Sequence, residues 1–99
     1  MPWVYIVQCL DDSFSVGSTR VLEVRIDEHV RGIGADYTKR HGFKRLAWAE
    51  EVDNVGEAYA LENKIQGWSH AKRQALIDGD FERLRTLSRN AKNRSRSTQ

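Results

Sequence analysis

The alternation of apolar and polar residues predicts a β-hairpin at the start of the chain. Trp3–Leu10 is rich in β-branched and aromatic residues and places apolar side chains on both alternating faces, which is typical of a buried strand. Asp11–Ser13 has the composition of a turn. Phe14–Gly17 then predicts a short second strand that pairs with the first.

A helical period replaces the strand pattern between Thr19 and about Gly32. Its inward face is formed by positions i, i+3, i+4 and i+7, which are Leu22, Arg25, Ile26 and His29. Val30 continues this face. An arginine and a histidine thus face inward where an ordinary amphipathic helix has leucines. Because burying such a group alone costs several kcal/mol, each is expected to have a polar partner.

Phe43–Glu51 predicts a third strand, with Leu46 and Trp48 at alternate positions on one face. Asp53–Asn54 can cap the helix that follows, and Gly67 ends it. The inward positions of this second helix are Ala58, Leu61, Glu62 and Ile65. An ionisable group therefore lies in the apolar stripe of this helix as well.

The other segments predict a loop, two short helices and a tail. Residues 31–42 mix glycines, bases and a tyrosine without a period, which predicts a loop. Ser69 can cap a short helix, and Phe81–Leu87 predicts one or two further helical turns. Trp48 and Trp68 are interpreted as core residues. Beyond residue 90, the Ser/Arg/Asn composition predicts disorder.

The predicted order β-β-α-β-α-α indicates a mixed α/β (α+β) fold in which helices flank a small sheet. At 99 residues with 39% apolar content, the chain is the size of one domain, placed at residues 1–90 and followed by a basic tail at 91–99. No stretch approaches about 18 consecutive apolar residues, and the start lacks a signal-peptide pattern. A cytoplasmic location without a membrane partner is expected. The lone Cys9 excludes an internal disulfide and a cysteine-based zinc site.

The net charge of +2 is unevenly distributed. Ten bases and all 14 acids lie at or before Glu82, so that part carries a net charge of −4, and the six bases after it carry +6. A nucleic-acid footprint must therefore be a local patch together with the tail.

Four residues carry groups that phosphodiester hydrolysis uses. Glu62 offers a carboxylate for a divalent metal, and Arg25 offers a charge that offsets that of a phosphate. Tyr5 and His29 offer a phenol and an imidazole that can handle the proton of water. Simpler interpretations are open: Arg25 and Glu62 can form a salt bridge at the edge of the core, and His29 can bond a backbone carbonyl.

The spacing of these residues resembles that of the GIY-YIG nuclease family, in its small stand-alone bacterial type. Trp3–Tyr5 takes the place of the first motif and Ser15–Gly17 that of the second. Arg25 follows Gly17 by eight residues, and His29 follows four residues later. Further segments that match are residues 32–38, 61–68 and 65–77. The resemblance covers about residues 3–77 and implies a small antiparallel three-stranded sheet flanked by helices.

The resemblance also implies a role for each motif residue. Glu62 would bind a single Mg²⁺ or Mn²⁺, and Arg25 would stabilise the transition state at the phosphate. Tyr5 would position or deprotonate the water, and His29 would assist as a hydrogen-bonding or proton-carrying group. The implied activity is that of a hydrolase, an endonuclease that cleaves DNA phosphodiester bonds, with DNA repair as its setting.

Ser15 departs from the motif, because it occupies the place of the second tyrosine next to the motif residue Gly17. A serine hydroxyl cannot serve as a phenolate-like base near neutral pH. Either Tyr5 or His29 takes over this role, or turnover is slow, or the site binds nucleic acid without cutting it. The alternative to an active endonuclease is thus a catalytically weakened nucleic-acid-binding module, and a protein-interaction domain is a third hypothesis. The sequence does not indicate the oligomeric state.

Basic residues interleaved with an aromatic one mark the predicted loop as a contact for DNA or another nucleic acid. Tyr37 lies beside Lys39 and Arg40, a combination that stacks on bases and binds phosphates. Lys72 and Arg73 can extend this patch. A solvated polar loop explains the same residues equally well, and a solubilising role explains the basic tail.

Overall fold

The computed structural model describes the backbone of residues 1–97 and the side chains of residues 1–89. The elements in chain order are β1 (Trp3–Cys9), β2 (Phe14–Thr19), α1 (Leu22–Val30), α2 (Asp36–His41), β3 (Phe43–Glu51), α3 (Val55–Gln66), α4 (His70–Asp78) and α5 (Phe81–Ser97). Contacts divide them into one compact unit at Met1–Gly67 and a second that begins at Trp68. No helix within residues 1–97 is long and apolar enough to cross a membrane.

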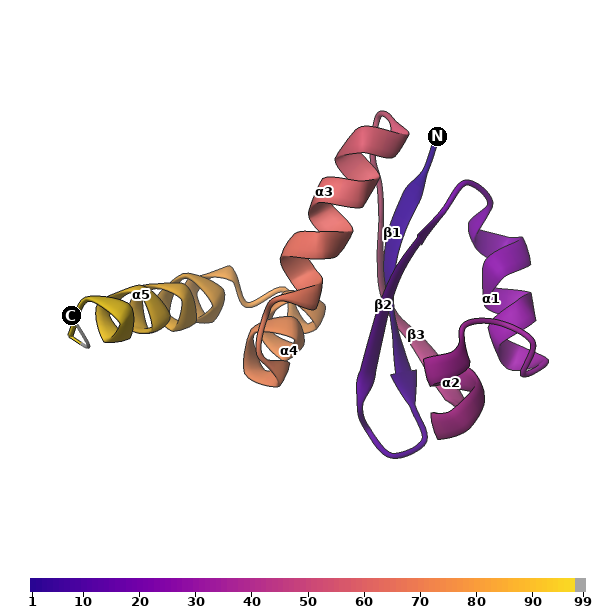
Figure 1. The fold of residues 1–99 in the computed structure, drawn as a ribbon, viewed down its shortest axis with the longest axis horizontal. Coiled ribbons are helices and arrows are strands. Elements are labelled where there is room, and N and C mark those ends of the chain that lie inside the picture. The colour runs from indigo at the N-terminus through magenta and orange to yellow at the C-terminus, as the bar shows by residue number, and fades with distance from the viewer. Residues whose placement is uncertain (98–99) are drawn as a thin grey trace. The chain divides into compact units, whose positions relative to one another are not determined.

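The first unit is built on a three-stranded sheet in the order β2-β1-β3. β1 pairs antiparallel with both neighbours, so β2 and β3 run parallel to each other on either side of it. Helices α1 and α2 cover one face of the sheet and α3 covers the other (Figure 1). The predicted class, a small antiparallel sheet flanked by helices, is confirmed.

The central strand β1 forms the core because helices cover both of its faces. Val4, Ile6 and Val7 have no exposed surface, and Ile65 of α3 is equally buried. Fully burying an aliphatic side chain contributes roughly 1.5–3 kcal/mol each. Apolar residues at consecutive positions of β1 are therefore what a strand covered on two sides requires.

The alternation predicted for β3 is interrupted by a bulge. Ile6 pairs with Trp48 and Val7 pairs with Leu46, so Ala47 has no partner on β1. Because neighbouring residues of β1 face opposite sides, Leu46 and Trp48 also face opposite sides rather than the same one. The prediction for this pair was wrong: Leu46 is exposed and Trp48 is half-buried.

The segment predicted as a loop contains the short helix α2. Asp36 lies in its first turn and bases lie in its last, which suits the helix dipole. Thr38 is its buried residue, at 2% exposure. The prediction of a loop over residues 31–42 was therefore wrong for half of that segment, and the prediction that Val30 faces inward was also wrong, since Val30 is exposed.

The predicted starts of α3 and α4 and the predicted end of α3 are confirmed. Asn54 accepts a hydrogen bond from the amide of Glu57, and Ser69 accepts one from the amide of Lys72. Each such cap stabilises its helix by about 1 kcal/mol. Gly67 follows the last residue of α3, as predicted.

The second unit contains α4 and α5, which contact each other. α5 continues to Ser97, well beyond the one or two turns expected from Phe81. Trp68, interpreted as a core residue, is half-buried, and Phe81 at the start of α5 is exposed. The tail predicted at residues 91–99 has its side chains outside the described residues, and the domain boundary at residue 90 stays a prediction.

Candidate active site

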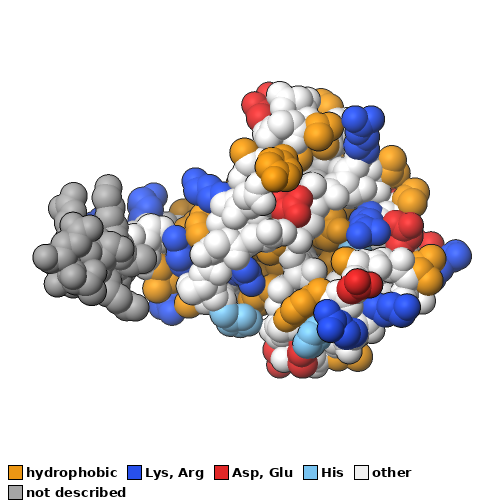
Figure 2. Space-filling view, viewed as in Figure 1, with side chains coloured by type: hydrophobic (Ala, Val, Ile, Leu, Met, Phe, Trp, Pro, Cys, Tyr) orange, Lys and Arg blue, Asp and Glu red, His pale blue; other side chains and the backbone are white. Residues whose placement is uncertain are grey.

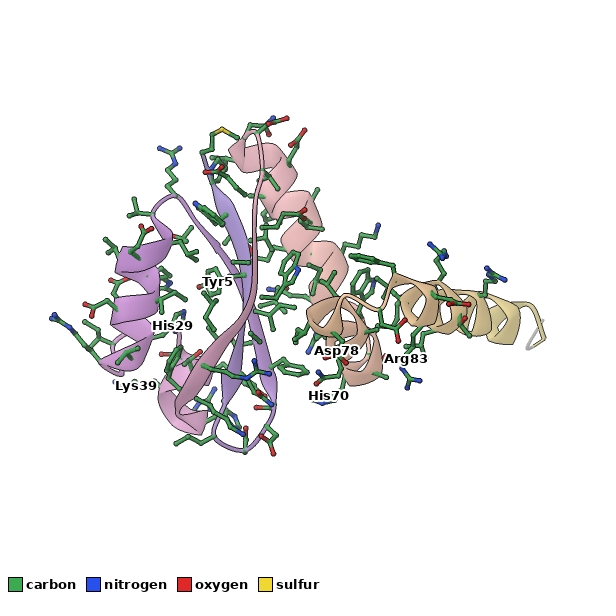
Figure 3. The ribbon with its side chains drawn as sticks, turned by 180° about the vertical axis from the view of Figure 1, so that it is seen from behind. Tyr5, His29, Lys39, His70, Asp78 and Arg83 are labelled. Atoms are coloured by element: carbon green, nitrogen blue, oxygen red, sulfur yellow. The ribbon has the colours of Figure 1, made fainter. Side chains whose placement is uncertain are left out.

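Three of the predicted residues meet between the sheet and α1. The Tyr5 hydroxyl lies 3.0 Å from Nε2 of His29 and accepts a hydrogen bond of 3.3 Å from Nε of Arg25. Figure 3 shows Tyr5 of β1 and His29 of α1 in the space between the helix and the sheet. Because Arg25 and His29 are four residues apart on α1, both side chains reach the hydroxyl of Tyr5.

These three groups differ in their access to solvent. Tyr5 and His29 are each 2% exposed, whereas the side chain of Arg25 is 31% exposed. An anion approaching this face would thus meet Arg25 first, with the phenol and imidazole behind it.

Burial sets the protonation of the inner pair. It raises the pKa of the Tyr5 phenol above its ordinary value of 10.0, although the hydrogen bond from Arg25 works in the opposite direction. Burial also lowers the pKa of His29 below 6.5, and the positive charge of Arg25 lowers it further. Near neutral pH, Tyr5 therefore keeps its proton and His29 is the neutral imidazole that can accept one.

The simpler interpretations of Arg25 and His29 do not hold among the described side chains. Arg25 forms its ion pair with Glu28, at 3.3 Å and one turn further along α1, rather than with Glu62. His29 bonds the Tyr5 hydroxyl rather than a backbone carbonyl, and its buried Nδ1 has no hydrogen-bond partner among the residues that the structure describes. The inward polar face of α1 thus serves a polar cluster and does not simply close the core.

Gly17 makes room for the phenol. It pairs with Tyr5 across β1 and β2, and a Cβ at Gly17 would lie 2.5 Å from the Tyr5 hydroxyl oxygen. Contacts that close essentially do not occur, so any larger residue would displace the hydroxyl from Arg25 and His29. Tyr5 of the first motif can therefore keep its position only because the second motif has a glycine, Gly17, opposite it.

Glu62 approaches the same part of β2 from the other side of the sheet. It lies on α3, where Ser18 donates a 2.6 Å hydrogen bond to Oε1 and Gln66 donates a 3.0 Å bond to Oε2. Ser18 directly follows Gly17, and the negative charge of Glu62 is close enough to raise the pKa of Tyr5. Gly17 and Ser18 at the edge of the sheet thus separate the phenol from the carboxylate.

The residues present fit a metal that takes one protein carboxylate. Within residues 1–89, no group of three or more His, Cys, Asp or Glu side chains is placed to hold an ion. Glu62 is half-buried, and its two oxygens keep acceptor capacity beyond the two hydrogen bonds they receive. Mg²⁺ commonly binds through one or two carboxylates and completes its shell with water and substrate phosphate. Glu62 alone is consistent with that mode.

Ser15 lies on the Tyr5 side of the sheet. It pairs with Val7, two residues along β1 from Tyr5, and is half-buried. Because alternate residues of a strand share a face, its hydroxyl points to the side occupied by α1 and α2. The position of the missing tyrosine is thus adjacent to the polar cluster.

The predicted nucleic-acid-binding residues fall on two helices. Tyr37, Lys39 and Arg40 are exposed on α2, where the Tyr37 ring stacks on His41 with centroids 4.2 Å apart. In Figure 2, basic side chains lie over the α2 part of the visible face, beside histidine and acidic side chains. Lys72 and Arg73 lie on α4 in the second unit, and Nζ of Lys72 is 4.9 Å from the centre of the Trp68 ring.

The sequence prediction did not include several residues that shape this site. Glu28 pairs with Arg25, while Ser18 and Gln66 hold Glu62. The period of α3 gave a signal for Gln66, since it lies four residues after Glu62 on the same helix. No local signal indicated Ser18, because its partner is 44 residues away.

The fold is a small α+β domain in which helices flank a three-stranded antiparallel sheet and a polar cluster lies between that sheet and α1. The family model for the GIY-YIG catalytic domain matches residues 1–75, and the chain belongs to this family. Members of the family are nucleases that act on nucleic acid and generally use a divalent metal ion.

Small stand-alone proteins are similar to this chain over most of their own length. The UPF0213 protein CPE1444 of Clostridium perfringens is 38% identical over 77 residues, which are 78% of this chain and 83% of that protein. The UPF0213 protein SSP2268 of Staphylococcus saprophyticus is 37% identical over 75 residues, covering 76% of this chain and 92% of the relative.

A solved structure supports the fold. The solution structure of the UPF0213 protein BH0048 from Bacillus halodurans matches with a TM-score of 0.51 and 34% identity, over 79% of this chain and 84% of that one. The names of these relatives assign no activity, metal or substrate.

Proposed function

We propose that this protein is a divalent-metal-dependent endonuclease that hydrolyses DNA phosphodiester bonds in the cytoplasm. The observation that carries the proposal is the Arg25–Tyr5–His29 hydrogen-bond network, placed beside Gly17 with Glu62 at the opposite side of the same strand segment. A structural core has no need of an arginine, a phenol and a neutral imidazole on one network.

Arg25 is the residue proposed to contact the phosphate. Its guanidinium is partly exposed, and Glu28 and the Tyr5 hydroxyl fix its orientation. A guanidinium held in this way stabilises the negative charge that develops in the transition state, and it does so without reorganising during the reaction.

Tyr5 and His29 are proposed to move the proton. Arg25 can only donate, so the Tyr5 hydroxyl accepts from it and keeps its own proton free for Nε2 of His29. Tyr5 can then take a proton from the attacking water as it gives one to the neutral imidazole. This arrangement assigns the base to His29 and does not require a phenolate.

Glu62 is proposed to hold the single Mg²⁺ or Mn²⁺. When bound, such an ion polarises a phosphate oxygen and lowers the pKa of a coordinated water. The carboxylate also supplies the negative charge that offsets the ion at a site where Arg25 is already positive.

Cleavage assays with purified protein test the proposal. Single-stranded, duplex and branched DNA are incubated with Mg²⁺, Mn²⁺ or EDTA, and one of these forms is expected to be nicked or degraded only with metal. Glu62→Gln and Arg25→Ala are each expected to lower the rate by at least about 10²-fold. Glu50→Gln, which removes an exposed carboxylate from β3, is the matched control and is expected to be as active as the unsubstituted protein. Clean protein that cleaves none of these forms with either metal contradicts the proposal.

The second candidate function is a nucleic-acid-binding module with weakened catalysis. Ser15 in place of the motif tyrosine, beside a Tyr5 that is only 2% exposed, favours it. This hypothesis predicts salt-sensitive DNA binding without turnover and a gain of cleavage on Ser15→Tyr. Turnover by the unsubstituted protein at the same rate as Ser15→Tyr excludes it.

A further inference from the structure

Both oxygens of the Glu62 carboxylate receive a hydrogen bond from a side chain. Ser18 Oγ lies 2.6 Å from Oε1, and Nε2 of Gln66 lies 3.0 Å from Oε2. The same Gln66 nitrogen is 3.5 Å from the carbonyl oxygen of Val16 on β2. The carboxylate is thus hydrogen-bonded at one oxygen to the strand and at the other to its own helix, through two exposed side chains.

The two donors are neutral, and this has a consequence for cation binding. A lysine or arginine in either place would neutralise Glu62 and compete with an incoming ion, whereas a hydroxyl and an amide leave its full negative charge available. Each carboxylate oxygen can accept a second bond beyond the one that it receives from the side chains of residues 1–89. Glu is among the side chains with the most rotamer freedom, so holding it in advance removes an entropy cost from cation binding.

The place of Ser18 in β2 couples this carboxylate to the phenol on the other face. Ser18 pairs with Val4, so its side chain faces α3, while Gly17 faces Tyr5. Two adjacent residues of β2 therefore act on opposite faces of the sheet. Gly17 leaves space for the Tyr5 hydroxyl, and Ser18 holds the carboxylate of Glu62.

We propose that Ser18 and Gln66 are positioning residues that orient the Glu62 carboxylate toward a divalent cation. The inference deepens the proposed function and rests on it, since it takes Glu62 as the ligand. Ser18 and Gln66 themselves are not assigned contact with the ion or with DNA.

The test measures Mn²⁺ binding to the full chain by electron paramagnetic resonance, with the metal alone as the probe. Ser18→Ala and Gln66→Ala are each expected to weaken Mn²⁺ binding by about 10- to 100-fold, the usual effect of removing a hydrogen-bond partner from a metal ligand. Ser18→Thr keeps a hydroxyl and is expected to bind Mn²⁺ as the unsubstituted protein does. In cleavage assays, the alanine variants are expected to need more Mn²⁺ for half-maximal rate and to recover at saturating metal.

Gln74→Ala is the matched control. Gln74 donates a 2.9 Å hydrogen bond to Asp78, four residues away on α4, as Gln66 does to Glu62 on α3. Its replacement removes the same kind of bond from a carboxylate with no assigned role, so Mn²⁺ binding is expected to stay unchanged. Thermal unfolding of every variant separates a loss of fold from a loss of binding.

The outcomes distinguish the two proposals. Mn²⁺ binding that survives Glu62→Gln, or no saturable binding by the unsubstituted protein, overturns the assignment of Glu62 and the positioning role with it. A second outcome overturns the positioning role alone: Mn²⁺ binding is lost in Glu62→Gln, but Ser18→Ala and Gln66→Ala bind Mn²⁺ as tightly as the unsubstituted protein does. If Ser18→Ala binds Mn²⁺ normally but has a lower melting temperature, the hydrogen bond from Ser18 serves only to stabilise the packing of α3 on β2.

Discussion

The place of the His29 ring depends on the absence of a side chain at Gly34. A Cβ at Gly34 would lie 2.5 Å from Nδ1 of His29 and 3.0 Å from its Cε1. His29 is 2% exposed, so packed neighbours leave the ring little room to move away. Gly34 thus does for the imidazole what Gly17 does for the phenol, and the two glycines confine the Tyr5–His29 pair.

Replacing Gly34 with alanine is expected to push His29 away from Tyr5. The cost in free energy of unfolding should be about 1–3 kcal/mol, as for other overpacked sites. Chemical denaturation measures this cost, and the ring ¹⁵N shifts of His29 report the altered hydrogen bond to the Tyr5 hydroxyl.

Gly67→Ala is the control for that substitution. The nearest atoms to a Cβ there are 3.6 Å away, which is ordinary contact, and the residue has a φ of −78° that alanine adopts freely. Its stability and His29 shifts are expected to stay close to those of the unsubstituted protein. Unchanged His29 shifts in Gly34→Ala would show that the loop yields instead of the ring.

The sequence predicted which polar side chains of α1 face the sheet better than it predicted their partners. Arg25 and His29 face inward because helical spacing alone puts them on one face of α1. Their partners depend on tertiary structure. One interpretation paired Arg25 with Glu62 on another helix, but its partner is Glu28, three residues further along α1. Long-range contacts such as that of Ser18 with Glu62 require the sheet order, which no local pattern supplies.

Among the elements, α2 is held to the tip of the β1–β2 hairpin. His41 donates a 2.6 Å hydrogen bond from Nδ1 to Asp11, and the backbone amide of Leu10 donates to the carbonyl oxygens of His41 and Gly42. The stacked Tyr37 ring extends this contact along α2. The turn between two strands thus sets the place of the helix that carries the proposed DNA contacts.

Loss of the Asp11 carboxylate is expected to loosen α2 and to change the acid stability of the protein. Hydrogen bonds from Ser13 and His41 lower the pKa of Asp11 from 3.8 to about 2. A lowered pKa stabilises the fold above pH 3.8, and that contribution is lost as the pH falls toward 2. Asp11→Asn should lose the pH dependence in this window and show faster amide hydrogen exchange in α2.

Asp12→Asn serves as the comparison for Asp11→Asn. Asp12 pairs with Lys44 of β3 and not with α2, so its replacement removes a carboxylate from the same turn without touching the helix. Exchange in α2 should stay slow in this variant. Equal exchange rates in both variants would mean that the backbone bonds of Leu10 alone hold α2.

Short elements escaped the sequence prediction for a physical reason. α2 has six residues, less than two turns, so no helical period can develop within it. The bulge at Ala47 could not be predicted from the sequence either, because one unpaired residue leaves the composition of β3 unchanged. The starts of α3 and α4, which have side-chain caps, and the end of α3 before Gly67 were predicted to within a residue or two.

In the whole molecule, the fold class followed from the order of the elements, and the sheet order did not. A hairpin fixes β1 beside β2, but β3 can join either edge of the hairpin without changing its own pattern. Its place beside β1 makes β1 the central strand, and helices then cover both faces of that strand (Figure 1), which the unbroken apolar run of β1 favours. The apolar run of β1 thus indicated that helices cover both of its faces, but no pattern in the sequence indicated that β3 is its second neighbour.

The charge of the whole chain predicts how salt affects DNA binding. Residues up to Glu82 carry a net charge of −4, whereas the segment after Glu82 has six bases, no acid and a net charge of +6. Replacing Lys92, Arg94 and Arg96 with serine is expected to weaken duplex binding. The slope of log K against log salt should become shallower by about 0.9 for each phosphate that the variant no longer neutralises. Fluorescence anisotropy of a labelled duplex at several salt concentrations measures the slope.

Lys64→Ser is the control for the tail variant, because it removes an exposed base from α3 and leaves the tail intact. The sequence preference of binding is expected to stay the same in the tail variant, since contacts with phosphates do not distinguish bases. Cleavage at saturating protein should also persist, because Arg25 and Glu62 are untouched. A tail variant with the salt slope of the unsubstituted protein would limit the tail to keeping the protein soluble, and the exposed bases of α2 would then have to supply the phosphate contacts.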